Sequence, residues 1–180
     1  MKIYLETQRM LLREFTELDI DNLVELDSDP KVTYYINGGK PTRRDHVVEQ
    51  IIPRILKYYS DLDRQGIWAA VEKKSGVFMG WFHLRPNRQN EAETELGYRL
   101  KRKYWGQGMA TEGSLALVKK GFEELKLDVI MAAADPANAA SRRVMEKVGL
   151  KYEKEMMEPD GFIIVKYRLD SADYFRKRDN

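Results

Sequence analysis

Residues 104–112 read Tyr-Trp-Gly-Gln-Gly-Met-Ala-Thr-Glu, which is a glycine turn that leads directly into a helix. Gly106 and Gly108 let the backbone curl with no Cβ in the way, so successive N–H groups and the helix N-terminus can converge on an anion. Four basic side chains just before the turn add positive potential: Arg99, Lys101, Arg102 and Lys103. The stretch predicts a phosphate-binding turn, although two glycines before a helix also occur in plain connections.

A second segment has the same organisation. Residues 129–134 form an apolar, strand-like run, and residues 135–149 follow with the sequence Asp-Pro-Ala-Asn-Ala-Ala-Ser-Arg-Arg-Val-Met-Glu-Lys-Val-Gly. This pattern is typical of a turn, a polar helix start and a short helix closed by glycine. The two segments together predict two strand-to-helix units that lie side by side.

Other stretches predict further strands. Two apolar runs, 67–71 and 77–84, are joined by Lys73-Lys74-Ser75-Gly76, which is typical of a hairpin. Residues 91–100 alternate, so that Ala92, Thr94, Leu96, Tyr98 and Leu100 share one face while Glu91, Glu93, Glu95, Gly97 and Arg99 share the other. A last strand is expected at 162–169, after the turn Glu158-Pro159-Asp160-Gly161.

The helices are predicted from caps and apolar stripes. Thr16 is expected to cap a helix that buries Ile20, Leu23 and Val24. A second helix is expected from Thr42, kinked at Pro53, with the stripe Val48, Ile51, Ile52, Ile55 and Tyr59. The helix after the glycine turn is expected to press Leu115, Val118, Phe122 and Leu125 onto the sheet. This order of elements predicts an α/β fold with a mixed sheet and helices on both faces.

In these patterns the chain resembles the GCN5-related N-acetyltransferase (GNAT) family, and within it the branch of the ribosomal-protein alanine N-acetyltransferases. The third matching pattern is the strand Arg9-Met10-Leu11-Leu12-Arg13, followed by Asp19, Asp29-Pro30 and Val32. The resemblance covers about residues 8–169 of one domain that spans residues 1–180. It implies the acyl-CoA N-acyltransferase fold, with a mostly antiparallel central sheet, and acetyl-CoA as the cosubstrate.

The resemblance also implies which residues bind the cofactor. The pyrophosphate of acetyl-CoA is expected on the turn at Gly106, Gly108 and Ala110, and its pantetheine arm beside Asn138. The implied cofactor-binding positions are Tyr98, Leu100, Gly106, Gln107, Gly108, Met109, Ala110, Thr111, Asn138 and Arg143. Arg142 is a further candidate for the ribose 3′-phosphate, and a solvated helix face is the alternative for either arginine.

Two catalytic residues are implied by position. Glu95 stands where several members carry a catalytic glutamate, and the alternative is an ordinary solvent-facing carboxylate. Many members carry a tyrosine acid seven residues after the asparagine, where this chain has Met145. In the alanine branch a serine three residues after the asparagine is the proposed proton donor, which Ser141 matches, against the alternative of a serine bonded to its own helix. Other candidates are Tyr152 beside the sulfur and, for the acceptor groove, Tyr34, Tyr35, Trp68, Trp81 and His83.

The composition excludes several classes of function. Lysine and arginine number 31 against 29 aspartates and glutamates, so no general affinity for nucleic acid is indicated. The chain has no cysteine and therefore no disulfide, thiolate nucleophile or acyl-cysteine intermediate. His46 and His83 lack ligand spacing, so no metal site is expected. Without a membrane-length apolar run or a secretion signal, we expect a cytoplasmic protein with no membrane partner. Exposed sheet edges are compatible with a homodimer.

Three classes of function follow. The first is direct transfer of acetyl from acetyl-CoA to a primary amine, either a protein N-terminus or a small molecule. An α-amine is roughly a quarter neutral near pH 7.4 and a lysine amine only about one part in a thousand, so an α-amine needs less help from Glu95. The second is a non-catalytic acyl-CoA-binding module, suggested by Met145. The third, a nucleotide-binding protein, is disfavoured because the turn lacks a P-loop ending and has Thr111 where a dinucleotide turn has glycine.

Overall fold

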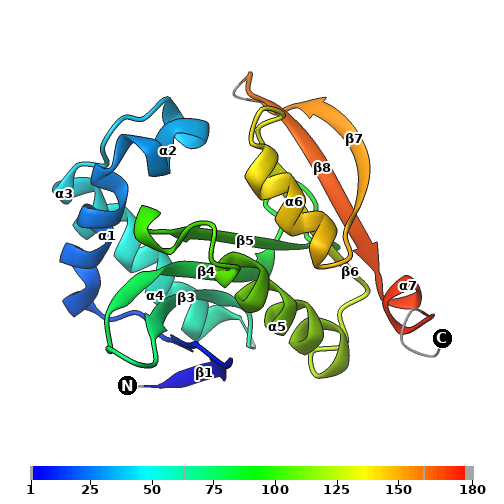
Figure 1. Cartoon of the computed structure of the whole chain (residues 1–180), viewed down its shortest axis with the longest axis horizontal. Coiled ribbons are helices and arrows are strands. Elements are labelled where there is room, and N and C mark those ends of the chain that lie inside the picture. Colours follow the sequence, from blue (N-terminus) through cyan, green and yellow to red (C-terminus); the bar gives the residue numbers. More distant parts are fainter. Residues whose placement is uncertain (1, 63, 160, 177–180) are drawn as a thin grey trace.

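A computed structural model of the chain describes residues 2–62, 64–159 and 161–176. Its centre is an eight-stranded sheet with the order β1-β2-β3-β4-β5-β6-β8-β7 (Figure 1). The strands are β1 (Ile3–Glu6), β2 (Met10–Arg13), β3 (Gly66–Glu72), β4 (Phe78–Pro86), β5 (Thr94–Leu100), β6 (Val129–Ala134), β7 (Lys151–Met157) and β8 (Ile163–Asp170). Neighbouring strands are antiparallel except β5 and β6, which are parallel. The predicted mixed, mostly antiparallel sheet is confirmed.

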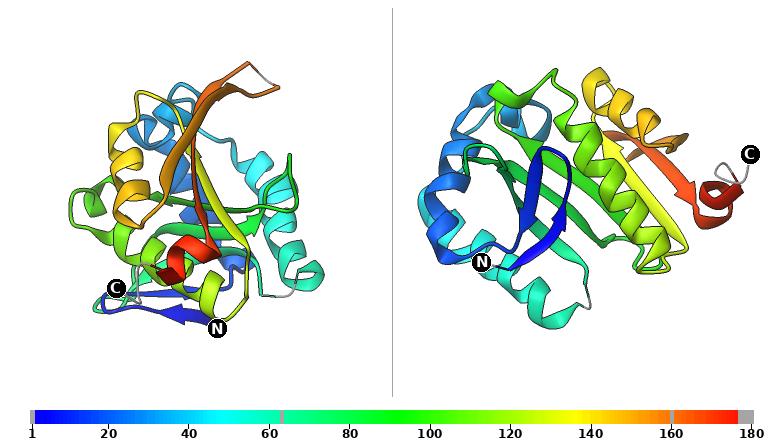
Figure 2. Two further views of the ribbon diagram at one scale, coloured as in Figure 1. Left: turned by 90° about the vertical axis from the view of Figure 1, so that its right-hand side faces the viewer. Right: turned by 60° about the horizontal axis from the view of Figure 1, so that its bottom comes forward.

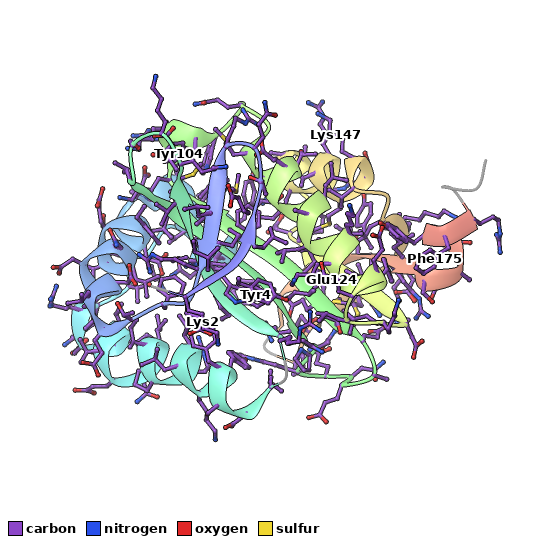
Figure 3. All side chains as sticks on the ribbon, turned by 90° about the horizontal axis from the view of Figure 1, so that it is seen from below. Lys2, Tyr4, Tyr104, Glu124, Lys147 and Phe175 are labelled. Carbon is purple, nitrogen blue, oxygen red and sulfur yellow. The ribbon has the colours of Figure 1, made fainter. Side chains whose placement is uncertain are left out.

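Helices cover both faces of this sheet (Figure 2). On one face lie α1 (Ile20–Ser28), α2 (Pro30–Asn37), α3 (Arg44–His46) and α4 (Ile52–Asp61), and on the other α5 (Met109–Glu123) and α6 (Ala139–Lys147). The period of two in β3 divides the core between them, because Ile67 and Ala69 pack with α1 and α4 while Trp68 and Ala70 pack with the α5 side. Tyr4 of β1 stacks on Trp68 with 3.8 Å between ring centroids (Figure 3).

The predicted helix around Pro53 has a different architecture. It begins at Arg44 and not at Thr42, and residues Val47–Ile51 form a wide π-helical turn before α4 starts. The Ile52 N–H donates to Val47 O, five residues back, and Pro53 follows directly in the first turn of α4. The change of pitch buries Val47 and leaves Val48 42% exposed, so Val48 does not belong to the stripe.

The stripe of α5 also differs from the prediction. Leu115 is 46% exposed, whereas small residues face the sheet, among them Gly113 and Gly121. A Cβ on Gly113 would clash with the edge of the Phe82 ring, and one on Gly121 would lie 2.8 Å from Ile130 Cδ1. Because these glycines have no side chain, α5 packs more closely on β4 and β6 than a helix with large side chains at those positions could.

Four further elements were not predicted: β1, α2, β7 and α7 (Ser171–Arg176). The signals for α2 were present, because Asp29 accepts from the Lys31 N–H at 2.9 Å, Pro30 occupies the first turn and Gly38 ends the helix in the left-handed region. β7 is mostly exposed and charged, so it has little of the apolar pattern that reveals a strand. The expected turn at 158–161 precedes β8, and its Asp160 lies outside the described residues.

The sheet is open between β5 and β6. These strands pair only at Thr94 with Ile130 and at Glu95 with Met131. Glu93, which the alternation placed on the same face as Glu95, is 4% exposed at this closed end, where Lys166 Nζ lies 2.8 and 2.9 Å from its two carboxylate oxygens. The expected strand at 91–100 begins only at Thr94. Beyond Glu95 the two strands separate, and the space between them becomes available for a ligand.

Candidate active site

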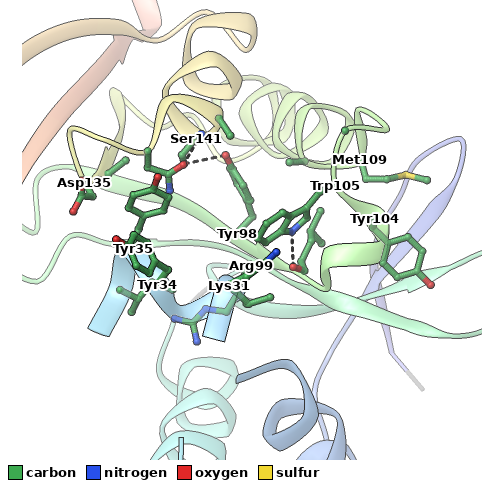
Figure 4. Close-up of a pocket in the computed structure, with 18 of the residues that line it drawn as sticks. Lys31, Tyr34, Tyr35, Tyr98, Arg99, Tyr104, Trp105, Met109, Asp135 and Ser141 are labelled. Carbon is green, nitrogen blue, oxygen red and sulfur yellow. Dashed lines mark hydrogen bonds between the residues drawn. The ribbon is translucent and has the colours of Figure 1, made fainter. Parts of the chain in front are cut away.

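A cavity of about 650 Å³ occupies the opening between β5 and β6 (Figure 4). Tyr98 and Leu100 of β5 form one wall, and Ala133 and Ala134 of β6 form the opposite wall. The cover comes from α2, whose exposed Tyr34 and Tyr35 line this cavity. The cavity therefore lies between the cofactor-binding segments that the sequence predicted and the helices of the other face.

The glycine turn meets this cavity at the N-terminus of α5. Gly108 is the N-cap residue, with φ +77°, and α5 has no side-chain cap. The first helical hydrogen bond runs from the Glu112 N–H to Gly108 O, so the N–H groups of residues 109–111 have no acceptor within the helix. Unpaired N–H groups and the positive end of the helix dipole form an environment suited to a phosphate.

Seven of the ten predicted cofactor-binding residues line the cavity: Tyr98, Leu100, Gly106, Gly108, Met109, Ala110 and Asn138. Gln107, Thr111 and Arg143 do not line it with the rest. The side-chain amide of Gln107 turns back to donate to Lys103 O at 2.6 Å, and Arg143 is exposed on α6. The neighbouring Arg142 is occupied elsewhere, because its Nε donates to Tyr167 Oη at 3.1 Å.

The glycine turn is anchored by residues that the sequence did not single out. Glu112 accepts from Thr7 Oγ1 at 2.6 Å, from the Arg9 N–H at 2.8 Å and from Arg9 Nε at 2.6 Å. Arg9 also donates to Gln107 O at 2.9 Å. On the other side, Trp105 Nε1 donates to Leu100 O at 2.8 Å, as drawn in Figure 4. These bonds tie the turn to the residues just before β2 and to β5.

Ser141 is positioned by the start of α6. Asn138 is the N-cap residue, and its Oδ1 accepts from the Ser141 N–H at 3.1 Å. The Ser141 hydroxyl lies 3.0 Å from Tyr98 Oη across the opening. Burial raises the pKa of Tyr98, and the hydrogen bond with Ser141 offsets part of that rise, so the phenol stays protonated. The Ser141 hydroxyl is therefore hydrogen-bonded to Tyr98 of β5 and not to the backbone of its own helix.

A second cavity of about 220 Å³ adjoins the first and is lined from both faces of the sheet, by Trp81 on one face and by Met145 on the other. It shares Tyr98, Arg99 and Ser141 with the larger cavity and adds Glu95 and His83. Glu95 Oε2 lies 2.6 Å from Arg85 Nη2, and Glu95 Oε1 lies 3.7 Å from His83 Nε2. Burial raises the pKa of Glu95, against the lowering influence of Arg85. Both predicted catalytic residues, Glu95 and Ser141, thus line one connected space.

The remaining candidates divide clearly. Trp81 and His83 line the smaller cavity. Trp68, in contrast, is 2% exposed and belongs to the core on the α5 side of the sheet. Tyr152 is 56% exposed on β7 and lines neither cavity. Met145 is buried and forms part of the wall of the smaller cavity.

In residues 2–62, 64–159 and 161–176 no group of three His, Cys, Asp or Glu side chains is arranged to hold a metal ion. Within the same residues, no helix combines the length and the apolar character that crossing a bilayer requires.

Comparison with known proteins agrees with this geometry. Residues 9–151 match the model of the acetyltransferase (GNAT) domain. The FsC-acetyl coenzyme A-N(2)-transacetylase of Aspergillus fumigatus is 33% identical over 147 residues, which are 78% of this chain and 58% of that protein.

Two solved structures share the fold. A GNAT-family acetyltransferase from Bacillus anthracis superposes with a TM-score of 0.79 at 24% identity, over 96% of this chain and 99% of that one. The ribosomal-protein-S5-alanine acetyltransferase from Vibrio fischeri gives a TM-score of 0.74 at 18% identity, over 94% and 97%. At these identities the structures support the architecture, and the domain match supports the family. The chain therefore belongs to the acetyltransferase (GNAT) family.

Proposed function

We propose that this protein transfers the acetyl group of acetyl-CoA directly to a primary amine. The observation that carries the proposal is the lining of the larger cavity. The uncapped N-terminus of α5 lies at one end of this cavity, and the Ser141 hydroxyl lies on its wall. These groups are suited to a ligand with a pyrophosphate at one end and a reactive sulfur at the other. The GNAT family uses acetyl-CoA, which is such a ligand.

The chain offers specific groups to each part of acetyl-CoA. The backbone N–H groups of residues 106–111 would hold the pyrophosphate, so Gln107 and Thr111 contribute through the backbone although their side chains do not line the cavity. Asn138 uses its Oδ1 as a helix cap, which leaves its amide N–H groups for the pantetheine arm. Arg143, exposed on α6, is available to the 3′-phosphate.

Ser141 is proposed to stabilise the leaving sulfur. With Tyr98 donating across the 3.0 Å contact, the Ser141 proton is free to point to the negative charge that develops on sulfur. A hydrogen bond of this kind lowers the barrier without proton release from Ser141. The thioester supplies the activated acetyl group, and the thiol proton comes from solvent when CoA leaves.

The acceptor is proposed to enter from the face of α1 and α2. The smaller cavity reaches the opening from that face and carries Glu95, held by Arg85 as a fixed carboxylate beside the path of the amine. The names of two similar proteins, one an N(2)-transacetylase and one a ribosomal-protein alanine acetyltransferase, support a nitrogen acceptor. A protein N-terminus and a small amine both fit this reading.

The first test is a thermal-shift comparison of acetyl-CoA, CoA, ATP and NAD. A ligand at a hundred times its Kd adds about 2.7 kcal/mol of stability, which is roughly 5–10 °C for a domain of this size. We expect this rise with acetyl-CoA and CoA, followed by CoA release when a panel of primary amines is added. A rise without CoA release from any amine would favour the non-catalytic binding module. A larger rise with ATP or NAD would refute the cofactor assignment.

A further inference from the structure

The first β-hairpin of the chain, formed by β1 and β2, contacts the start of α5 through its turn. Thr7 Oγ1 donates to Glu112 Oε1 at 2.6 Å, and the Arg9 N–H donates to the same oxygen at 2.8 Å. Arg9 Nε donates to the other carboxylate oxygen at 2.6 Å. Two distant parts of the sequence thus meet at the helix end that the proposed function gives to the pyrophosphate.

Glu112 carries its negative charge in the first turn of α5, next to the place of a negatively charged ligand. A carboxylate near a helix N-terminus can bond the free N–H groups of its own helix, and it then competes with an anion for them. Here the two carboxylate oxygens accept three hydrogen bonds from Thr7 and Arg9, and the side chain is 18% exposed. These bonds hold the carboxylate against the hairpin and leave the N–H groups of residues 109–111 to a ligand.

The Arg9 guanidinium also orients a peptide group inside the glycine turn. Its Nη1 donates to Gln107 O at 2.9 Å, and its Nη2 lies 3.6 Å from where a Cβ on Gly108 would be. In a trans peptide the C=O and the following N–H point in opposite directions. The Gly108 N–H therefore points away from Arg9, and Gly108 itself lines the larger cavity. One guanidinium thus fixes both a carboxylate and a peptide group beside the ligand.

Arg9 stands on a rigid base. Met10 and Leu12 of β2 are fully buried, which fixes the strand in the core. At the other end of the strand, Arg13 forms two hydrogen bonds of 2.7 Å with Asp19, which is almost fully buried just before α1. The two arginines therefore attach one buried strand to the glycine turn on one side and to the covering helices on the other.

We propose that Arg9 is a positioning residue for the pyrophosphate, which it serves by neutralising Glu112 and by holding the peptide between Gln107 and Gly108 with its N–H toward the cofactor. This inference rests on the proposed function and adds a residue from outside the glycine turn. Arg9 lines neither cavity, so it acts through Glu112 and Gln107 and not by touching the ligand. Its influence is confined to the phosphates, because the pantetheine arm is assigned to Asn138, on another helix.

The test compares two ligands that differ in the pyrophosphate: CoA, which carries it, and pantetheine, which lacks it. Arg9→Met should raise the Kd for CoA by about tenfold or more, which is about 1.4 kcal/mol, and leave the Kd for pantetheine within about twofold. CoA is titrated by calorimetry and pantetheine by amide chemical shifts, at a temperature at which wild type and variant are both folded. Equal losses for the two ligands would make Arg9 a plain structural tie, and an unchanged Kd for CoA would equally overturn the proposal.

Two further variants separate the role of Arg9 from general damage. Arg64→Met removes an ion pair of 3.1 Å with Glu124 at the opposite end of α5 and should leave both Kd values unchanged. A loss of CoA affinity in this control as large as that of Arg9→Met overturns the assignment. Adding Glu112→Gln to Arg9→Met should restore much of the CoA affinity, since the unpaired charge is then gone, and no recovery would overturn the neutralising role.

The outcomes also separate this inference from the proposed function. A wild type that binds CoA no more tightly than pantetheine contradicts the cofactor site itself. A wild type that prefers CoA, with an Arg9→Met variant that prefers CoA to the same degree, contradicts only the role of Arg9.

Discussion

Replacing Gly97 by alanine should separate cofactor binding from turnover. Gly97 lies opposite His83 in the β4–β5 register, and an added Cβ would sit 2.5 Å from His83 Nε2, 2.6 Å from Cε1 and 3.2 Å from Cδ2. Ordinary contacts between such atoms are about 3.5–4.0 Å, so the imidazole must retreat by roughly 1 Å. Its stacking on Trp81 and its full burial oppose that movement.

The size of the effect follows from this clash. Overpacking of a tight site costs about 1–3 kcal/mol, and each kcal/mol lowers the Tm of a domain of this size by about 2–4 °C. His83 lines the smaller cavity, and a misplacement of about 1 Å at such a site can cost on the order of a hundredfold in rate. The larger cavity does not include Gly97, so the affinity for acetyl-CoA should stay within about twofold of the wild type.

The assay combines urea unfolding, calorimetric titration with acetyl-CoA and steady-state acetyl transfer. Gly66→Ala is the matched control, because it adds the same methyl to a strand glycine whose Cβ would meet Tyr59 at 3.3 Å and which lines neither cavity. We expect that control to keep its turnover. Wild-type turnover in Gly97→Ala, or a loss of acetyl-CoA affinity as large as the loss of rate, would refute the assignment of His83 to the acceptor side.

Three other changes probe the cofactor side. Ser141→Ala should lower kcat by about a hundredfold with little change in the Kd for acetyl-CoA, measured by kinetics and calorimetry; equal kcat would remove Ser141 from the mechanism. Gly108→Val puts a β-branched residue at φ +77° and should abolish the thermal shift with CoA, whereas a retained shift would make the turn a plain connection. Glu112→Gln should reduce the free energy of unfolding at pH 7 by about 1–2 kcal/mol. Burial raises the pKa of Glu112, but the hydrogen bonds from Thr7 and Arg9 outweigh it and leave the pKa lowered. The wild-type advantage is therefore present above about pH 4.5 and declines as the pH falls through the lowered pKa, so urea curves at pH 7 and pH 3.5 that differ by the same amount would contradict it.

The cofactor side of the molecule could be predicted from local sequence. A glycine turn and a polar helix start can each be recognised from a few consecutive residues, which is why Gly108, Asn138 and Ser141 were identified. All three line one cavity. The anchors of the turn were missed for the opposite reason. Thr7 and Arg9 reach Glu112 from more than a hundred residues away, and no local pattern connects them.

Charged residues on alternating strands were the main source of error. Alternation placed Glu93 and Glu95 on one side of a single strand, with solvent exposure as the alternative to a catalytic role for Glu95. The strand starts at Thr94, however, and Glu93 is buried against Lys166 of β8. From sequence alone, a glutamate that will pair with a buried lysine cannot be distinguished from a glutamate on the surface. His83 was recognised only as a candidate for the groove, because the space that leaves its Nε2 unpaired appears only when β4, β5 and α6 are assembled.

The opening between β5 and β6 is bounded by ion pairs of two kinds. At its closed end Glu93 and Lys166 are almost fully buried, so dissolved salt screens their attraction only weakly. At the mouth, α1 is tied to β5 by Asp27 and Arg99, a second largely buried pair. Lys101 with Glu25 and Arg102 with Asp29 join α1 and the start of α2 to the segment after β5, and these pairs are partly exposed and therefore screened. We therefore expect dissolved salt to weaken only the outer attachment of the helices that cover the cavity, while the buried pairs hold the opening itself in place.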